Sequence, residues 1–230
     1  MHRILGPFLA VAAALATIAP AQAQPAAARM PLGRPTAPPV GYVEFCLARP
    51  GECLEQVGRT PSGTSPFSAF WREAFRDDQT SSLAVDEPAA GDGTRGLVAL
   101  TSANLELLNT INRAVNEAIA PAADRVGGRV ADIWSLPLLE GAGRGDCEDY
   151  VLEKRRALMA RGLPAEALSI AVVRTRHGES HAVLVVDTDL GELVLDNRST
   201  RISRWTEVDY RWVKRQSRLD PAVWVRVEAL

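Results

Sequence analysis

The stretch GDCEDYVLEKRRALMARGLP, residues 145–164, decides the fold because it predicts a helix that carries a cysteine in its first turn. Asp146 is a favourable N-cap residue, and Asp149 three residues later forms a variant of the capping box. Gly162 ends the helix, and Pro164 prevents it from continuing. Its apolar face consists of Val151, Leu152, Leu158 and Met159. We therefore expect a packed helix with the cysteine at its N-terminal end.

Runs dense in valine, leucine and isoleucine follow this helix and predict strands. They occupy residues 168–175, 181–187, 193–195 and 222–227. Upstream, apolar residues recur at helical spacing and predict another helix, which begins at Thr101 or Ser102 and ends at Pro121. These apolar positions are Leu105, Leu108, Ile111, Val115 and Ile119. Helices followed by strands indicate an α+β domain with an antiparallel sheet.

The chain has three cysteines, two of which are separated by a turn-like stretch. In an oxidising compartment Cys46 and Cys53 are the natural disulfide pair, and two unpaired buried thiols are the alternative. Pairing them leaves Cys147 as a free thiol. A reactive thiol must ionise, and the N-terminus of a helix favours its thiolate. The acidic neighbours of this thiol oppose ionisation unless a cation neutralises them. These neighbours are Asp146, Glu148 and Asp149.

A thiol nucleophile also needs a base, and only two histidines follow the N-terminal segment. His177 lies in a turn-like stretch that is typical of a solvated side chain. His181 opens an apolar strand, where a polar residue faces either an edge or a site. A structural histidine is the alternative at this position. We therefore take His181 as the candidate base.

A hairpin brings an acid to His181. A four-residue loop at residues 188–191 would pair Asp187 with Glu192. Asp196 would then share a face with His181, at a diagonal Cα distance of about 7–8 Å. Such an acid orients an imidazole and stabilises its charged form. A turn-capping carboxylate is the alternative for Asp196, and a shift of one residue in register would turn it to the opposite face.

The N-terminus predicts export. Residues 1–23 combine a basic start, an apolar run too short for a comfortable membrane span and an Ala-Gln-Ala cleavage pattern, which is typical of a signal peptide. An uncleaved anchor is the alternative. Residues 24–39 are rich in alanine and proline and predict a flexible leader, and residues 40–230 predict one domain. The formal net charge of −2 argues against a nucleic-acid-binding protein.

Three blocks, in this order, resemble the bacterial transglutaminase-like cysteine proteinases. They are Gly145-Asp146-Cys147-Glu148-Asp149-Tyr150, His181-Ala182-Val183-Leu184 and Leu193-Val194-Leu195-Asp196-Asn197. The resemblance covers residues 41–215 and implies a papain-like, transglutaminase-like fold, with the nucleophile at a helix N-terminus packed on an antiparallel sheet. It implies that Cys147 attacks a carbonyl carbon, His181 moves the proton and Asp196 orients His181. The backbone N–H of Cys147 is then one donor of the oxyanion hole.

The resemblance also implies calcium, a protein substrate and the periplasm. The best-known members are calcium-dependent periplasmic proteases that release large surface adhesins and so control biofilm detachment. Some are restrained by an inner-membrane receptor that responds to cyclic di-GMP. In such members acids beside the nucleophile bind calcium, which here points to Asp146 and Glu148, with Asp149 as a further candidate. The alternative is that these acids only cap the helix and favour its dipole.

Other functions remain open for such a chain. Acyl transfer to an amine uses the same three residues as hydrolysis, and access to the acyl-enzyme decides between them. A non-catalytic calcium- or peptide-binding module is a further alternative, although a binding module has no need of a free thiol. Residues 121–128 are richer in alanine and glycine than we expect of adhesin-cleaving members, which leaves the substrate open.

Overall fold

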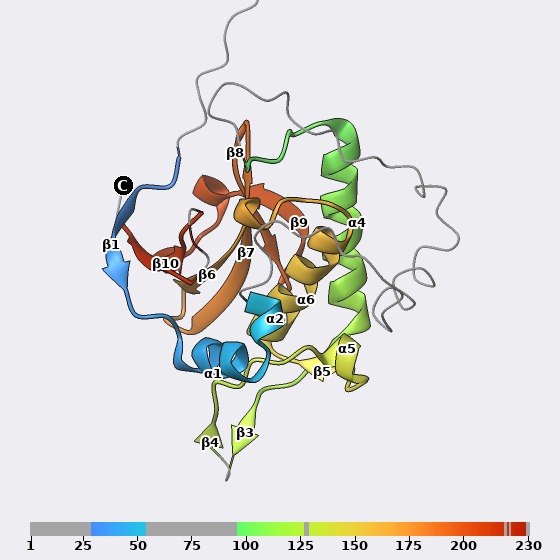
Figure 1. Cartoon of the computed structure of the whole chain (residues 1–230), viewed down its shortest axis with the longest axis vertical. Helices are drawn as coiled ribbons and strands as arrows, with labels where there is room; N and C mark the ends of the chain where they lie inside the picture. Colours follow the sequence, from blue (N-terminus) through green and yellow to red (C-terminus); the bar gives the residue numbers. More distant parts are fainter. Residues whose placement is uncertain (1–28, 54–95, 127–128, 219, 221, 229–230) are drawn as a thin grey trace, which may run out of the picture.

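A seven-stranded sheet forms the centre of the part of the chain that the computed structural model describes, namely residues 29–53, 96–126, 129–218, 220 and 222–228. All neighbouring strands in it are antiparallel, in the order β1-β11-β10-β6-β7-β8-β9 (Figure 1). Its strands are β1 (Leu32–Thr36), β6 (Leu168–Arg174), β7 (Ser180–Thr188), β8 (Gly191–Asp196), β9 (Ser199–Arg204), β10 (Arg211–Gln216) and β11 (Trp224–Val227). The predicted α+β fold with an antiparallel sheet is confirmed.

Two long helices lie side by side along one face of the sheet (Figure 1). They are α4 (Ser102–Ala118), which packs on β9, and α6 (Cys147–Ala160), which packs on β7. Their apolar residues, among them Leu108 and Leu158, form the larger hydrophobic core with alternate residues of the strands. A smaller core around Trp205 covers the opposite face of β7 and β8. Shorter helices are α1 (Val40–Ala48), α2 (Pro50–Cys53) and α5 (Pro137–Glu140).

Local sequence explains where the two long helices begin. Thr101 caps α4, because its side-chain oxygen accepts a hydrogen bond from the Asn104 backbone N–H at 3.1 Å. Asp149 caps α6 through a hydrogen bond from the Asp146 backbone N–H to Asp149 Oδ2 at 3.2 Å. Leu105 is 39% exposed, so its assignment to the apolar stripe of α4 was wrong. Its position on the helix is about 90° away from the centre of the stripe.

A short parallel pairing fixes the segment before α6. β2 (Ala120–Pro121) follows α4 directly and pairs with β5 (Arg144–Gly145), which ends two residues before Cys147. Backbone hydrogen bonds from Ala120 to Gly143 (2.9 Å) and from Ala122 to Gly145 (2.8 Å) hold the two together. The end of α4 is thereby tied to the start of α6. A small hairpin of β3 (Arg125–Val126) and β4 (Arg129–Val130) follows β2.

The predicted hairpin has the expected register and a shorter loop. Asp187 pairs with Glu192, as predicted, but Thr188 also pairs with Gly191, so that only two residues remain in the loop. Gly191 adopts a positive φ of 109°, which a glycine accommodates without strain. The register therefore puts the side chains of β7 and β8 on the predicted faces.

The prediction that residues 24–39 form a flexible leader is wrong for the second half of that range. β1 lies within residues 24–39, pairs with β11 and occupies one edge of the sheet. Met30 is 4% exposed, in the smaller core. The alanine- and proline-rich composition concealed this strand, because an edge strand needs hydrogen bonds from only one neighbour. β9 and β10 were also missed, since their polar and charged side chains lack the dense apolar pattern of a buried strand.

Cys46 and Cys53 form the predicted disulfide, which links α1 to α2 with a Cα–Cα distance of 5.6 Å. Cys147 is a free thiol. The proposed signal peptide, residues 1–23, lies outside the described residues. Within the residues that the structure describes, no helix has the length and apolar character needed to span a membrane.

Candidate active site

The N-terminus of α6 presents the predicted nucleophile. Cys147 is the first residue of the helix and is partly buried. Its thiol donates a hydrogen bond to Glu148 Oε2 at 2.7 Å. Burial raises the pKa of the Cys147 thiol well above its usual range, the charge of Glu148 raises it further, and a hydrogen bond with the Ala182 backbone lowers it. The expected activating effect of the helix N-terminus is therefore outweighed in this state, and the thiol is protonated.

The Asp149 carboxylate forms hydrogen bonds with the segment that precedes α6. Its Oδ1 accepts hydrogen bonds from the Ser135 backbone N–H at 2.7 Å and from Ser135 Oγ at 3.1 Å, while Oδ2 caps α6. A Cβ atom at Gly145 would lie only 2.3 Å from Asp149 Oδ2. Gly145 thus makes room for this carboxylate. These contacts favour the capping role over the metal-ligand role for Asp149.

Three carboxylates form an acidic cluster around the predicted nucleophile: Asp124, Asp146 and Glu148. Burial raises the pKa of Asp146, and the charge of Asp124 raises it further. Burial also raises the pKa of Glu148 to about 8, with a contribution from the charge of Asp146. Asp124 Oδ2 and Asp146 Oδ1 are buried and accept no hydrogen bond from any residue that the structure describes. Ionisation of these carboxylates beside Cys147 is therefore unfavourable unless a positive charge offsets it.

The predicted base and its acid meet on adjacent strands. His181 is the second residue of β7 and Asp196 ends β8, and each residue is 5% exposed. His181 Nε2 lies 2.9 Å from Asp196 Oδ1. Although burial raises the pKa of Asp196, hydrogen bonds from His181, Tyr210 and the Arg198 backbone N–H outweigh it and hold the pKa below its usual range. This carboxylate is therefore ionised and fully supplied with donors.

The predicted nucleophile and the predicted base lie on elements that pack against each other. The hydrogen bond between Cys147 and the backbone of Ala182 sets the thiol beside the residue that follows His181. α6 packs directly on β7. His177 is exposed in the turn between β6 and β7, as predicted for a solvated histidine. The fold thus places Cys147 beside β7, the strand that carries His181, and joins His181 to Asp196 on β8.

Sequence reasoning missed Tyr210, which donates a hydrogen bond from its hydroxyl to Asp196 Oδ2 at 2.6 Å. Its ring also meets the His181 ring edge-on, with centroids 5.6 Å apart. Tyr210 lies just before β10, a strand that the sequence did not reveal. No local motif marks it, because its role depends on the packing of distant strands.

Side chains of α4 and α6 lie near Asp196 and near the turn that follows it. Asn116 Nδ2 on α4 donates to the Asp196 carbonyl oxygen at 3.0 Å. Asn112 Nδ2 donates to the Ser199 carbonyl at 3.2 Å and so holds the turn between β8 and β9. Lys154 on α6 is fully buried, and its Nζ has no hydrogen-bond partner among the described residues. Burial lowers the pKa of Lys154 to about 7, and the charge of Asp196 opposes this shift.

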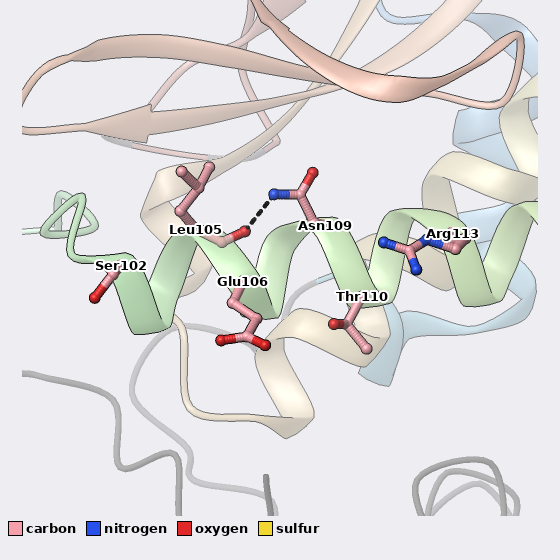
Figure 2. Close-up of a pocket in the computed structure, with 6 residues that line it drawn as sticks. All are labelled: Ser102, Leu105, Glu106, Asn109, Thr110 and Arg113. Atoms are coloured by element: carbon pink, nitrogen blue, oxygen red, sulfur yellow. Dashed lines mark hydrogen bonds between the residues drawn. The ribbon is translucent and has the colours of Figure 1, made fainter. Parts of the chain in front are cut away.

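A separate hollow lies along the exposed side of α4 (Figure 2). Its lining comprises Ser102, Leu105, Glu106, Asn109, Thr110 and Arg113. None of these is a predicted site residue. The Asn109 side chain donates to the Leu105 carbonyl at 2.9 Å within the helix, so this part of the lining is satisfied internally (Figure 2).

Three solved structures of LapG from Legionella pneumophila are similar to this chain. The calcium-bound form is 24% identical, covers 57% of this chain and 75% of its own, and has a TM-score of 0.47. A second form is 25% identical, covers 53% and 68%, and has a TM-score of 0.46. The EGTA-treated form is 26% identical, covers 53% and 66%, and has a TM-score of 0.45.

A comparison with curated proteins gave no significant match. The family model of the bacterial transglutaminase-like cysteine proteinases (BTLCP) matches residues 84–230, which include α4, α6 and six of the seven strands described above. This match confirms the predicted transglutaminase-like fold and the assignment as a cysteine peptidase. The chain belongs to the bacterial transglutaminase-like cysteine proteinase family.

Proposed function

We propose that this protein is an exported cysteine peptidase that cleaves a specific protein substrate with Cys147, His181 and Asp196. The observation that supports the proposal most strongly is the buried hydrogen bond of 2.9 Å between His181 Nε2 and Asp196 Oδ1. That contact leaves Nδ1 of His181 as the ring nitrogen that can take a proton from the thiol. Family membership supports the cysteine as the nucleophile.

The chemistry follows from these positions. The proton of the Cys147 thiol passes to His181, and the thiolate forms a bond to the carbonyl carbon of the scissile peptide. The backbone N–H of Cys147 donates to the developing oxyanion. The carbon–nitrogen bond breaks as the imidazolium returns the proton to the leaving amine, which leaves a thioester. Water then loses a proton to His181, hydrolyses the thioester and restores the thiol.

Asp196 has two tasks in this scheme. Its hydrogen bond to Nε2 selects the tautomer and orientation of His181. Its negative charge stabilises the imidazolium that forms when the thiol loses its proton. The lowered pKa of Asp196 supports both tasks, because the carboxylate stays ionised in a buried place.

Calcium belongs to the proposal because the acidic cluster suits a hard cation. The carboxylates of Asp146 and Glu148 would hold the ion, and Asp124 adds a third oxygen donor that the sequence did not suggest. The buried, unpartnered oxygens of Asp124 and Asp146 support this fit. When bound, calcium would supply positive charge that offsets the negative charge beside Cys147. Among the described residues no three such side chains already converge on one point, so the ligands would have to adjust.

The calcium assignment has a direct test. Titration calorimetry of the purified mature protein should show calcium binding that Asp146→Ala and Glu148→Ala each weaken at least tenfold. Glu140→Ala, which removes an exposed partner of Arg49, is the matched control and should bind like the wild type. Equal affinity in all four proteins would remove the site from the proposal.

The substrate and the location are the remaining parts of the proposal. The resemblance to adhesin-releasing proteases suggests a large surface adhesin, cleaved in the periplasm after removal of residues 1–23. Control by an inner-membrane receptor is part of the same suggestion. The oxidised pair Cys46 and Cys53 is consistent with an exported protein, since disulfides persist in oxidising compartments.

The test is cleavage of candidate exported adhesins by the mature protein, with calcium and with excess chelator. We expect cleavage in calcium that Cys147→Ala and His181→Ala abolish. His177→Ala changes an exposed histidine four residues away and should cleave like the wild type. Cleavage that survives Cys147→Ala would overturn the proposal. Transfer of an amine to the substrate without cleavage would replace hydrolysis with acyl transfer.

A further inference from the structure

We propose that Tyr210 is a positioning residue of this site: its hydroxyl fixes the Asp196 carboxylate, and its ring restrains His181. The inference rests on the proposed function, since it assigns Tyr210 a role through the His181–Asp196 pair. Tyr210 itself is partly exposed and is not required to touch the substrate.

The hydrogen bonds divide the Asp196 carboxylate between its partners. Oδ1 accepts from His181 Nε2 at 2.9 Å and from the Arg198 backbone N–H at 2.9 Å. Oδ2 accepts from the Tyr210 hydroxyl at 2.6 Å. Without that hydroxyl, Oδ2 would lose its hydrogen bond from a side chain, and the carboxylate could rotate about its Cβ–Cγ bond. Rotation would carry Oδ1 away from the imidazole.

The Tyr210 ring supplies a second restraint. It meets the His181 ring edge-on at 65°, with centroids 5.6 Å apart. The histidine is thus held by Asp196 in the ring plane and by Tyr210 from the side. The edge-on arrangement is one of the favoured geometries of two aromatic rings. The two contacts together define both the tilt and the direction of the imidazole.

Tyr210 reaches the pair from an independent part of the fold. It precedes β10, which is separated from β7 by β6 in the sheet. It packs against the smaller core on the sheet face opposite the two long helices. The thiol approaches β7 from the helix side, so Tyr210 can brace the base without blocking the nucleophile.

The titratable groups that face the pair come from several elements. His181 on β7 and Lys154 on α6 face Asp196, and Arg198 after β8 and the Cys147 thiol on α6 face Tyr210. Burial and then the hydrogen bond to Asp196 raise the pKa of Tyr210 well above its usual range. The hydroxyl therefore stays protonated and remains a donor throughout the pH range in which the enzyme would work. Donation to an ionised acceptor is stronger than a neutral hydrogen bond.

Two variants separate the hydroxyl from the ring. Tyr210→Phe keeps the ring contact and removes the hydrogen bond, whereas Tyr210→Leu removes both. Tyr42→Phe is the matched control, because the Tyr42 hydroxyl accepts a buried hydrogen bond from Gln216 Nε2 at 2.8 Å in the larger core. Each Phe variant loses one hydroxyl from one hydrogen bond, but only one of the two bonds involves Asp196.

The first readout is the NMR signal of the His181 Nε2 proton, which does not depend on activity. This proton, assigned by its absence from Asp196→Asn, should be sharp and shifted downfield in the wild type and in Tyr42→Phe. We expect Tyr210→Phe to broaden it and speed its exchange at least tenfold, and Tyr210→Leu to abolish it. An unchanged signal in a folded Tyr210→Phe protein would overturn the inference.

The second readout is kinetic and uses the adhesin fragment that the wild type cleaves. Tyr210→Phe should lower kcat about tenfold and leave KM unchanged, because one lost charge-assisted hydrogen bond corresponds to roughly this factor. Tyr42→Phe should retain kcat even where its melting temperature falls. If Asp196→Asn is inactive while Tyr210→Phe retains full kcat, this inference alone fails. If Asp196→Asn is itself fully active, the proposed function fails.

Discussion

The carboxylates on the two sides of the site differ in the hydrogen-bond donors available to them. We call the side formed by β7 and β8 the strand side, and the side formed by the N-terminus of α6 the helix side. On the strand side, Asp196 is 5% exposed, accepts hydrogen bonds on both oxygens and has a lowered pKa. On the helix side, the acidic cluster leaves buried oxygens of Asp124 and Asp146 without a donor, and burial raises the pKa of Glu148 to about 8. Burial acts in the same direction on both sides, so the supply of donors decides the outcome.

This difference assigns distinct needs to the two sides. The strand side is complete with protein groups alone, since His181, Tyr210 and the Arg198 backbone satisfy Asp196. On the helix side, burial and then the charge and hydrogen bond of Glu148 raise the pKa of the Cys147 thiol, so positive charge nearby would favour its ionisation. In the proposed function calcium supplies that charge. The following predictions test each side in turn.

The largest effect is expected on the strand side. Asp196→Asn should lower kcat by about 10²–10⁴-fold, because an amide cannot hold the same tautomer of His181 or stabilise its charge. Asp209→Asn is the control, since Asp209 is exposed and only 4.0 Å from Arg176 in a weak surface pair. Kinetics of substrate cleavage measure both. If kcat falls less than threefold in a folded Asp196→Asn protein, the claim that Asp196 is essential for cleavage is contradicted.

Behind Asp196, the buried Lys154 should lower stability in a pH-dependent way. Its pKa is lowered to about 7 in the folded state from 10.5, so the unfolded chain binds more protons between these values. Lys154→Met should therefore stabilise the protein most at and below pH 7, by about 1–4 kcal/mol. The gain should shrink towards pH 10.5, as the wild type recovers stability.

Urea unfolding at pH 6, 8 and 9.5 measures this gain. Arg201→Met is the control, because Arg201 is an exposed cation whose guanidinium lies 3.9 Å from the Glu207 carboxylate at the surface, and it should change stability little at any of these pH values. A gain for Lys154→Met that is the same at every pH would show that the ammonium is not desolvated in the folded protein.

A smaller effect is expected on the helix side. In excess chelator, Glu148→Gln should speed alkylation of Cys147 by iodoacetamide about tenfold at pH 9, because the wild-type Glu148 carboxyl, whose pKa is raised to about 8, carries its charge there. Removing the Glu148 charge lowers the thiol pKa, and one pKa unit changes the thiolate fraction tenfold. Glu140→Gln should leave the rate unchanged. Mass spectrometry of the labelled cysteine gives the rates, and equal rates in the two variants would show that Glu148 does not control the thiol.

The sequence predicted those parts of the site that local chemistry determines. The cap formed by Asp149 and the register that faces His181 towards Asp196 both follow from spacing along one or two elements. The leader was partly wrong, because β1 owes its place to pairing with β11, nearly 200 positions away in the chain. Tyr210 and Asp124 were missed for the same reason. Their roles arise from tertiary packing, which no local pattern records.

The most direct test of the whole account is the pH dependence of Cys147 alkylation in calcium and in excess chelator. When Asp196 orients His181 and calcium offsets the charge of the acidic residues beside Cys147, the thiol should react well below pH 7. His181→Ala should abolish that reactivity. In chelator the same protein should react only at high pH. If calcium leaves the profile unchanged, or if the thiol titrates like a free cysteine with a pKa of about 8.5, the account is contradicted.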